Sequence, residues 1–320
     1  MKIGIYSITY RGVWYRGDAI DLFQLPRLVK SQGWEGLELD TERPHAAPMD
    51  LTADDRRRFR DLAGELDLPI SAVSPNCDLS SPVASRQEAT ICYVRECIKL
   101  THDLGAPICK IFAAWRGITM HDGIGSYDLT YGHDPYPFWQ EDRRRWVVPA
   151  IRELAAMAGD HGIVLAVQNH GPDIVNNYRD TLSLIEEVGS PHFKACMDIN
   201  IEDEPESEQR AAEMVRASGN LQVHSHVNGE FVRDADGRVV LAGAGYFDQQ
   251  FWGRKVAYPA YFDALVAAGY DGFMDWEFCH PAMENGECAG LGYVHHQTEL
   301  ALEYMKTLRA EAQQKTAGNP

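Results

Sequence analysis

Several apolar runs in this sequence end in side chains that can bind a metal ion or carry a proton. These runs are GIVLAVQNHG, ACMDIN, LQVHSHVNG and GFMDWEFCH. The polar residues that they deliver are Gln168, His170, Asp198, His224, His226, Asp275 and Glu277. Oxygen donors combined with imidazole suit Mn²⁺, Mg²⁺ or Co²⁺ better than a metal that prefers thiolates. The pattern predicts a divalent-metal site, provided that the fold brings these strand ends together.

The elements around these runs alternate between short apolar strands and longer amphipathic helices. In 143–159, for example, apolar residues recur at helical spacing. Strict alternation of this kind predicts parallel strands, and eight such units predict a closed (β/α)₈ TIM barrel, an α/β fold. We expect strands near 2–8, 36–40, 69–74, 107–113, 163–169, 193–198, 221–227 and 272–278.

Domain organisation follows from the same pattern. We expect a single barrel domain over residues 1–308 and a loose tail over 309–320. Long loops follow strand 4 (115–141) and strand 7 (229–258), and the second should contain a hairpin that turns at Asp236 and Gly237. In this fold, the carboxyl ends of the strands form the active-site face, so both loops would border the predicted site.

Composition restricts the class of partner. The 320 residues include 30 Lys and Arg and 47 Asp and Glu, so the net charge is −17. This charge argues against nucleic acid as a partner. No apolar run reaches the roughly 20 residues needed to span a membrane, and the first residues lack the pattern of a signal peptide. The seven cysteines are scattered without paired spacing, which favours reduced thiols. We expect a cytoplasmic protein that acts on a small molecule.

The chain resembles the xylose isomerase-like TIM barrels, a superfamily of sugar isomerases, ketose 3-epimerases and endonuclease IV-type enzymes. In the epimerase branch, side chains from strands 5 to 8 hold one metal ion, for which Mn²⁺ is the expected choice. The resemblance places Asp198 (CMDIN), His226 (HSHVNG) and Glu277 (DWEF) in the metal site, and Glu277 also in catalysis. The fourth ligand position, usually Glu, is Gln168 here. A Gln carbonyl can still bind a cation but cannot take a proton.

Another base is therefore expected, and the long loop after strand 4 offers His133 within YGHDPYPFW. A histidine beside a carboxylate suits general base catalysis. With this loop, the chain resembles the larger subunit of the C-glycoside deglycosidases. That resemblance implies removal of the carbon-2 proton of a 3-oxo-glycoside, loss of the aglycone by β-elimination, and a small second subunit in a hetero-oligomer; without that subunit, a homo-oligomer is expected.

Four further side chains are predicted to contact substrate. They are His224, Trp115, Arg254 and His170, each of which has an ordinary alternative role in packing or in bonding a neighbour. Two other functions stay open for the whole chain: a sugar isomerase or ketose epimerase, and a sugar-binding barrel without catalysis. An endonuclease IV-type enzyme is disfavoured by the net charge and by the few ligands available for a three-zinc cluster.

Overall fold

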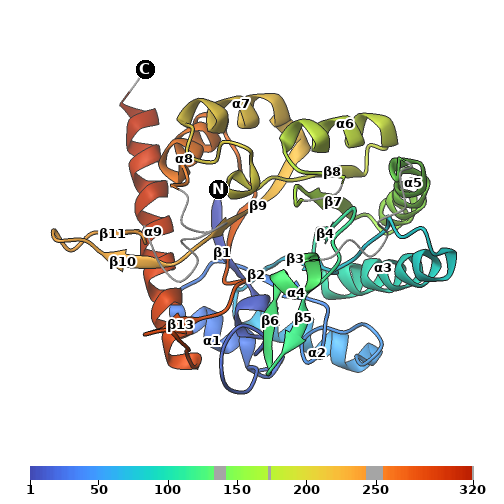
Figure 1. Cartoon of the computed structure of the whole chain (residues 1–320), viewed down its shortest axis with the longest axis horizontal. Coiled ribbons are helices and arrows are strands. Elements are labelled where there is room, and N and C mark those ends of the chain that lie inside the picture. The colour runs from blue at the N-terminus through green and yellow to red at the C-terminus, as the bar shows by residue number, and fades with distance from the viewer. Residues whose placement is uncertain (133–141, 172–173, 243–254, 319–320) are drawn as a thin grey trace.

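The computed structural model describes residues 1–132, 142–171, 174–242 and 255–318. Eight parallel strands close into a barrel in the order β1-β12-β9-β8-β7-β4-β3-β2, and helices surround it (Figure 1). The predicted (β/α)₈ fold is confirmed. The barrel strands are β1 (Lys2–Tyr6), β2 (Leu37–Asp40), β3 (Ile70–Ser74), β4 (Ile108–Ile111), β7 (Val164–Gln168), β8 (Phe193–Cys196), β9 (Gln222–Asn228) and β12 (Phe273–Glu277).

Local sequence signals mark the ends of several helices. Thr52 and Asp55 form a capping box at the start of α2, in which each side chain bonds the other residue's backbone N–H. Gly33, with φ of 92°, ends α1, as the glycine before a strand predicts. The helices are α1 (Leu25–Gln32), α2 (Ala53–Glu65), α3 (Ala84–Leu104), α4 (Tyr127–Tyr131), α5 (Arg144–Asp160), α6 (Tyr178–Val188), α7 (Glu208–Ser218), α8 (Tyr258–Ala267) and α9 (Leu291–Ala317), with 3₁₀ turns η1 (Ser7–Tyr10), η2 (Ile199–Ile201) and η3 (Gly219–Leu221).

Polar groups extend into the barrel interior. Asp275 of β12 is fully buried and accepts a hydrogen bond of 2.5 Å from Ser71 of β3, across the barrel. The neighbouring strand must leave room for this carboxylate, because a Cβ atom at Gly4 would lie 2.1 Å from Asp275 Oδ1. The polar interior is continuous with the carboxyl ends of the strands, where the predicted site lies.

The two long loops contain structure of their own. The predicted hairpin after strand 7 is present as β10 (Phe231–Arg233) and β11 (Val239–Leu241). After β4, the strands β5 (Thr119–His121) and β6 (Ile124–Ser126) form a second hairpin that leads into α4, which the sequence did not predict. A third short hairpin joins β13 (Met283–Glu284) to β14 (Glu287–Cys288).

The carboxyl end of the chain differs from expectation. The predicted domain boundary at residue 308 lies inside α9, which continues to Ala317 instead of becoming loose. Ala312 is fully buried, so the last turns of the helix still pack on the body of the protein, and Ala, Glu, Gln and Lys are good helix formers. None of the helices in the described part of the chain combines the length and apolar composition needed to cross a membrane.

Candidate metal centre at the carboxyl ends of the strands

Four of the predicted site residues meet at one end of the barrel. Gln168 and Glu277 are the last residues of β7 and β12, Asp198 follows β8 by two residues, and His226 lies in β9. All four are buried, with 7% exposure or less. The strands are adjacent in the order β12-β9-β8-β7, so parallel pairing brings these residues to the same edge although they are far apart in sequence.

His226 lies between two carboxylates. Its Nδ1 atom is 3.0 Å from Asp198 Oδ2, and its Nε2 atom is 2.7 Å from Glu38 Oε2. Its backbone N–H also donates to Asp198 Oδ1 at 2.8 Å. Burial alone lowers the pKa of His226, but the charges of Asp198 and Glu38 outweigh it and raise the pKa well above its usual value. The imidazole orientation is therefore fixed from both sides.

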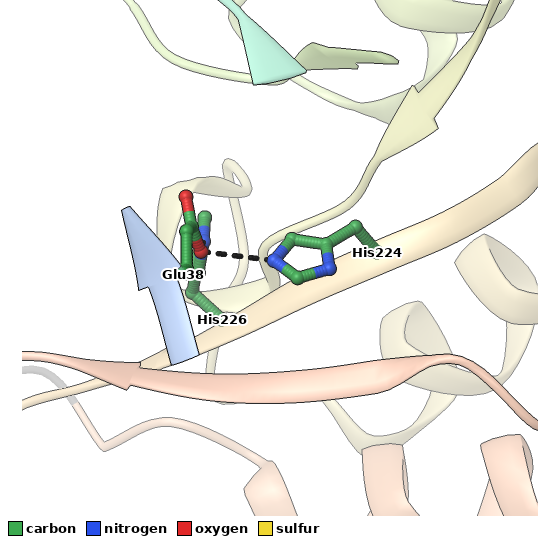
Figure 2. Close-up of side chains that lie close together, drawn as sticks. All are labelled: Glu38, His224 and His226. Atoms are coloured by element: carbon green, nitrogen blue, oxygen red, sulfur yellow. Dashed lines mark hydrogen bonds and ion pairs between the residues drawn. The ribbon is translucent and has the colours of Figure 1, made fainter. Parts of the chain in front are cut away.

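Glu38, on β2, is a member of the site that was not among the predicted residues. Figure 2 shows its carboxylate beside both histidines of β9. His224 Nε2 lies 2.9 Å from Glu38 Oε2, and Lys110 Nζ lies 3.4 Å from Oε1. Burial raises the pKa of Glu38, yet His226, Lys110 and His224 together hold it well below the ordinary range. Glu38 is thus a charged group in a fully buried position.

Lys110 and Gln168 form a second link, along the adjacent strands β4 and β7. Lys110 Nζ donates to Gln168 Oε1 at 2.9 Å, and Gln168 Nε2 donates to Asp198 Oδ2 at 2.5 Å. A lysine only donates and an ionised carboxylate only accepts, so these two partners fix which way the amide points. Gln168 is predicted to ligate a metal through its carbonyl oxygen. To do so, that oxygen must give up its hydrogen bond with Lys110 and bind the ion instead.

Glu277 has a different environment. Its Oε1 atom accepts a hydrogen bond of 3.2 Å from Asn228 Nδ2, and no cation bonds it among the described residues. Burial, followed by the nearby charge of Asp198, raises the pKa of Glu277, while His226 opposes the rise. A buried carboxylate with only a neutral partner is poised to accept either a proton or a metal ion.

The donor set fits a divalent ion. Two groups of three side chains each bring their ligand atoms within 4.8 Å of one another, and both groups include His226. They are Glu38 with His224 and His226, and Cys196 with Asp198 and His226. Burial raises the pKa of the Cys196 thiol to about 12, so oxygen and imidazole donors dominate, the combination that suits Mn²⁺, Mg²⁺ or Co²⁺.

The predicted substrate contacts are spread around this centre. His224 is fully buried, and its Nε2 atom lies beside Glu38 Oε2, so it belongs to the Glu38 cluster. Trp115 is buried, stacks on Phe112 and meets the edge of the His170 ring at a centroid distance of 6.3 Å. His170 Nδ1 lies 2.9 Å from the carbonyl oxygen of Gly171, which is the ordinary neighbour contact. The predicted residues His133 and Arg254 lie outside the described residues.

The comparisons with known proteins agree with this geometry. The fold and the buried centre define a TIM barrel with a candidate metal site at the carboxyl ends of its strands. Residues 26–309 match the family described as a xylose isomerase-like TIM barrel, and the chain belongs to that family.

Among solved structures, the chain is similar to a D-psicose 3-epimerase with D-tagatose from Clostridium cellulolyticum H10, with a TM-score of 0.70, 16% identity, and 97% and 99% of the two chains covered. It is also similar to a 3-keto-D-glucoside 4-epimerase from E. coli, with a TM-score of 0.67, 16% identity, and 96% and 99% covered. An L-ribulose 3-epimerase gives a TM-score of 0.69 at 18% identity, with 99% and 97% covered. At these identities the similarity establishes the fold.

Proposed function

We propose that this protein is a metal-dependent sugar isomerase or epimerase that moves a proton at the carbon beside a sugar carbonyl. The observation that carries the proposal is the buried cluster around His226, in which two groups of three side chains bring their ligand atoms within 4.8 Å of one another. Glu277, the last residue of β12, is buried at the same end of the barrel and has no cationic partner among the described residues. Membership of the family and the epimerases among the similar structures support a sugar as substrate.

Each side chain has a defined part in this proposal. Asp198, His226 and Glu277 would hold the ion, with Gln168 as the fourth position, and a bound divalent ion would stabilise negative charge on the carbonyl oxygen. Glu277 would accept the proton from the substrate carbon, oriented by Asn228. Glu38 would fix the His226 ring through Nε2, the role of a carboxylate behind a metal-binding histidine.

A second candidate reaction follows from Gln168. An epimerase must return a proton on the opposite face, and Gln168 cannot supply one. An elimination needs one base beside the carbonyl: as the carbon-2 proton is removed, the bond from carbon 1 to the aglycone breaks, a double bond forms between carbons 1 and 2, and the aglycone carbon takes a proton from solvent. The same residues are compatible with this cleavage of a 3-oxo-C-glycoside. In that case, His133 is the proposed base, and a small second subunit is the expected partner.

Isotope exchange separates these reactions. The metal-loaded protein is incubated in ²H₂O with ketohexoses, with 3-oxo-glucosides and with 3-oxo-C-glucosides, and products are followed by NMR. Deuterium incorporation with an inverted centre supports the epimerase, and release of free aglycone supports the elimination. Metal and sugar binding without exchange into any of these compounds would contradict both reactions and leave a binding protein.

The position of the ion is tested by a matched pair of variants. Asp198→Asn and Glu38→Gln each neutralise one carboxylate that contacts His226, on opposite sides of its ring. If the ion lies on the Nδ1 side, Asp198→Asn should lose most of the bound metal, whereas Glu38→Gln should weaken affinity by about 10–100-fold, as for outer-shell partners. The reverse order would place the ion between Glu38, His224 and His226.

A further inference from the structure

Asn169 is a buried polar residue to which the proposed function gives no part. It follows Gln168, the last residue of β7, and it is fully buried. The parallel pairing of β7 with β8 ends at Gln168 and Cys196. Asp198 lies two residues beyond Cys196, so its backbone N–H and C=O groups need other partners. Asp198 is fully buried as well, and a buried backbone group without a hydrogen bond is costly.

The Asn169 side chain supplies those partners. Its Oδ1 atom accepts a hydrogen bond of 2.7 Å from Asp198 N–H, and its Nδ2 atom donates to the Asp198 carbonyl at 3.0 Å. That carbonyl also accepts from Ile201 N–H, at 3.3 Å. A neighbouring strand in a parallel sheet likewise bonds both the N–H and the C=O group of one residue. The amide of Asn169 therefore replaces a backbone partner at the point where the pairing of β7 and β8 has ended.

A further contact fixes the orientation of this amide. Asn169 Nδ2 also donates to Glu202 Oε1 at 3.1 Å, and the same oxygen accepts from Tyr178 N–H at 2.7 Å. Tyr178 is the first residue of α6, so the amide is tied to the start of that helix. A carboxamide offers two donor hydrogens and an acceptor oxygen on one short side chain, and in Asn169 all three are bonded. The side chain of Asn169 is therefore held in one orientation.

The carboxylate of Asp198 is bonded by other members of the site. Its Oδ1 atom accepts from His226 N–H at 2.8 Å, and its Oδ2 atom lies 3.0 Å from His226 Nδ1. Gln168 Nε2 donates to Oδ2 at 2.5 Å. These contacts hold the end of the side chain, whereas Asn169 holds the backbone from which it extends. Because a shift of that backbone would move the carboxylate relative to His226 Nδ1, the geometry of the centre depends on the Asn169 amide.

We propose that Asn169 is a positioning residue of the metal centre: its amide fixes the backbone of Asp198 and thereby aims the Asp198 carboxylate at His226 and at the ion. Asn169 acts through Asp198 and needs no contact with the ion or the substrate. The inference rests on the proposed function for the presence of the ion, whereas the contact between Asp198 and His226 is tested without it. Outer-shell partners of metal ligands contribute about 10–100-fold to metal affinity.

Two substitutions separate hydrogen bonding from the filling of space. Asn169→Ala removes the amide and leaves a void, whereas Asn169→Thr is of similar size but has one hydroxyl in place of the amide. Asn177→Ala is the matched control. The Asn177 side chain caps α6, where it accepts from the N–H groups of Arg179 and Asp180. Its loss weakens the start of a helix and leaves the bonds between Asn169 and Asp198 in place.

Metal affinity is measured by titration with Mn²⁺ against a competing chelator. We expect Asn169→Ala and Asn169→Thr to weaken the affinity by about 10–100-fold and Asn177→Ala to keep the native value. Native affinity in Asn169→Thr together with a loss in Asn169→Ala would mean that the side chain only fills space, and would overturn the inference. An equal loss in Asn177→Ala would also overturn it, because the loss would then follow the stability of the connection.

A second measurement needs no metal. In protein labelled with ¹⁵N-histidine, NMR detects the ring N–H protons of His226, which are assigned by their absence in His226→Gln. The Nδ1 atom lies beside Asp198 and the Nε2 atom beside Glu38. We expect Asn169→Thr to speed exchange of the Nδ1 proton with solvent by about tenfold, the scale of one lost hydrogen bond, and to leave the Nε2 proton unchanged.

Failure of the proposed function has a different signature from failure of this inference. If the native protein binds no divalent ion, the metal centre of the proposed function fails, and the ring protons of His226 alone decide the role of Asn169. Faster exchange of the Nδ1 proton in Asn169→Thr, with native exchange in Asn177→Ala, would then support the inference. An Nδ1 proton that exchanges at the native rate in Asn169→Thr would overturn it.

Discussion

Glu38 on β2 and Glu277 on β12 are buried carboxylates at the same end of the barrel, but burial has opposite outcomes for them. Glu38 contacts His224, His226 and Lys110, and its pKa lies well below the ordinary value. Glu277 bonds only Asn228 among the described residues, and its pKa is raised. Burial by itself raises the pKa of both carboxylates. The cations nearby therefore decide whether the net pKa shift is downward or upward.

This difference divides the site into two sides. On the side of β2 and β4, Glu38 has counter-charges within the protein, because Lys110 of β4 and the two histidines of β9 neutralise it. On the side of β8 and β12, Asp198 and Glu277 raise each other's need for positive charge, and His226 supplies most of it, with a smaller contribution from Lys110. Buried charge is costly unless it is paired, so the side of β8 and β12 is the one that a divalent cation would stabilise.

His226 contacts both sides, and its removal should have the largest effect. His226→Ala deletes the one residue common to both candidate ligand groups, so metal content should fall close to zero. Turnover should fall by more than about 100-fold, the upper range for outer-shell partners. Elemental analysis and deuterium exchange measure the two losses. His102→Ala, in an exposed position of α3, is the control, and full metal content in His226→Ala would refute the shared role.

Lys110→Met tests how much the counter-charge of Glu38 contributes to stability. The change leaves Glu38 without one cation and Gln168 Oε1 without its donor, so the free energy of unfolding should fall by about 3–5 kcal/mol, as expected when one partner of a buried pair is lost. Chemical denaturation gives the value. Lys99→Met, at an exposed ion pair with Glu96, should cost at most about 1 kcal/mol. Equal losses in the two variants would mean that Lys110 contributes no more than a surface charge.

Glu202, which follows β8, is a third buried carboxylate, and it should make the stability of the protein depend on pH. Burial raises its pKa from 4.5 to about 7, although it accepts bonds from Tyr178 N–H and Asn169. The folded protein therefore holds this proton more tightly than the unfolded chain. The resulting stability is complete below about pH 4.5 and is lost as pH rises through about 7.

Glu202→Gln removes this ionisation while it keeps an oxygen for both donors. Relative to the native protein, the variant should gain stability between pH 5 and pH 8, by at most about 3 kcal/mol for a shift of this size. Thermal unfolding at the two pH values measures the difference. Glu206→Gln, exposed in the same segment, should show no such gain, and a pH-independent effect of Glu202→Gln would contradict the assignment.

Gln168→Glu should give the smallest effect. It tests whether the ion lies on the side of Asp198 and Glu277. The new carboxylate adds negative charge beside Asp198. If Gln168 borders the ion, metal affinity should tighten by about tenfold, equivalent to about 1.4 kcal/mol. A metal titration with a competing chelator gives the constant. An unchanged affinity would place Gln168 outside the ligand shell, as a link between Lys110 and Asp198.

Much of the fold was predictable because its signals are local. All eight barrel strands were anticipated to within three residues at each end, since a buried parallel strand is a short apolar run. The hairpin at Asp236 and Gly237 was equally visible. The tail was misjudged because its polar composition masked good helix formers, and the hairpin of β5 and β6 was missed because its strands have only three residues each.

The site was half predictable. Asp198, His226 and Glu277 end apolar runs, which is a recognisable pattern, but their roles as metal ligands stay a prediction. Glu38 in GLELD and Lys110 in PICKIFA carried a signal that was not used, namely a charged residue inside a run destined for burial. Such a residue needs a counter-charge, and nothing in the linear sequence names the partner.

The sequence by itself determined the alternating elements, the closed barrel and the end of the barrel at which polar side chains gather, because periodicity and composition act over neighbouring residues. Only the tertiary structure decided that Glu38 meets His226 across 188 positions of sequence and that Lys110 takes the oxygen of Gln168. Those pairings depend on barrel closure, which sets the distances between charges on different strands. The resulting distances, and not residue type alone, determine which buried carboxylates are neutralised within the protein and which are left to a ligand.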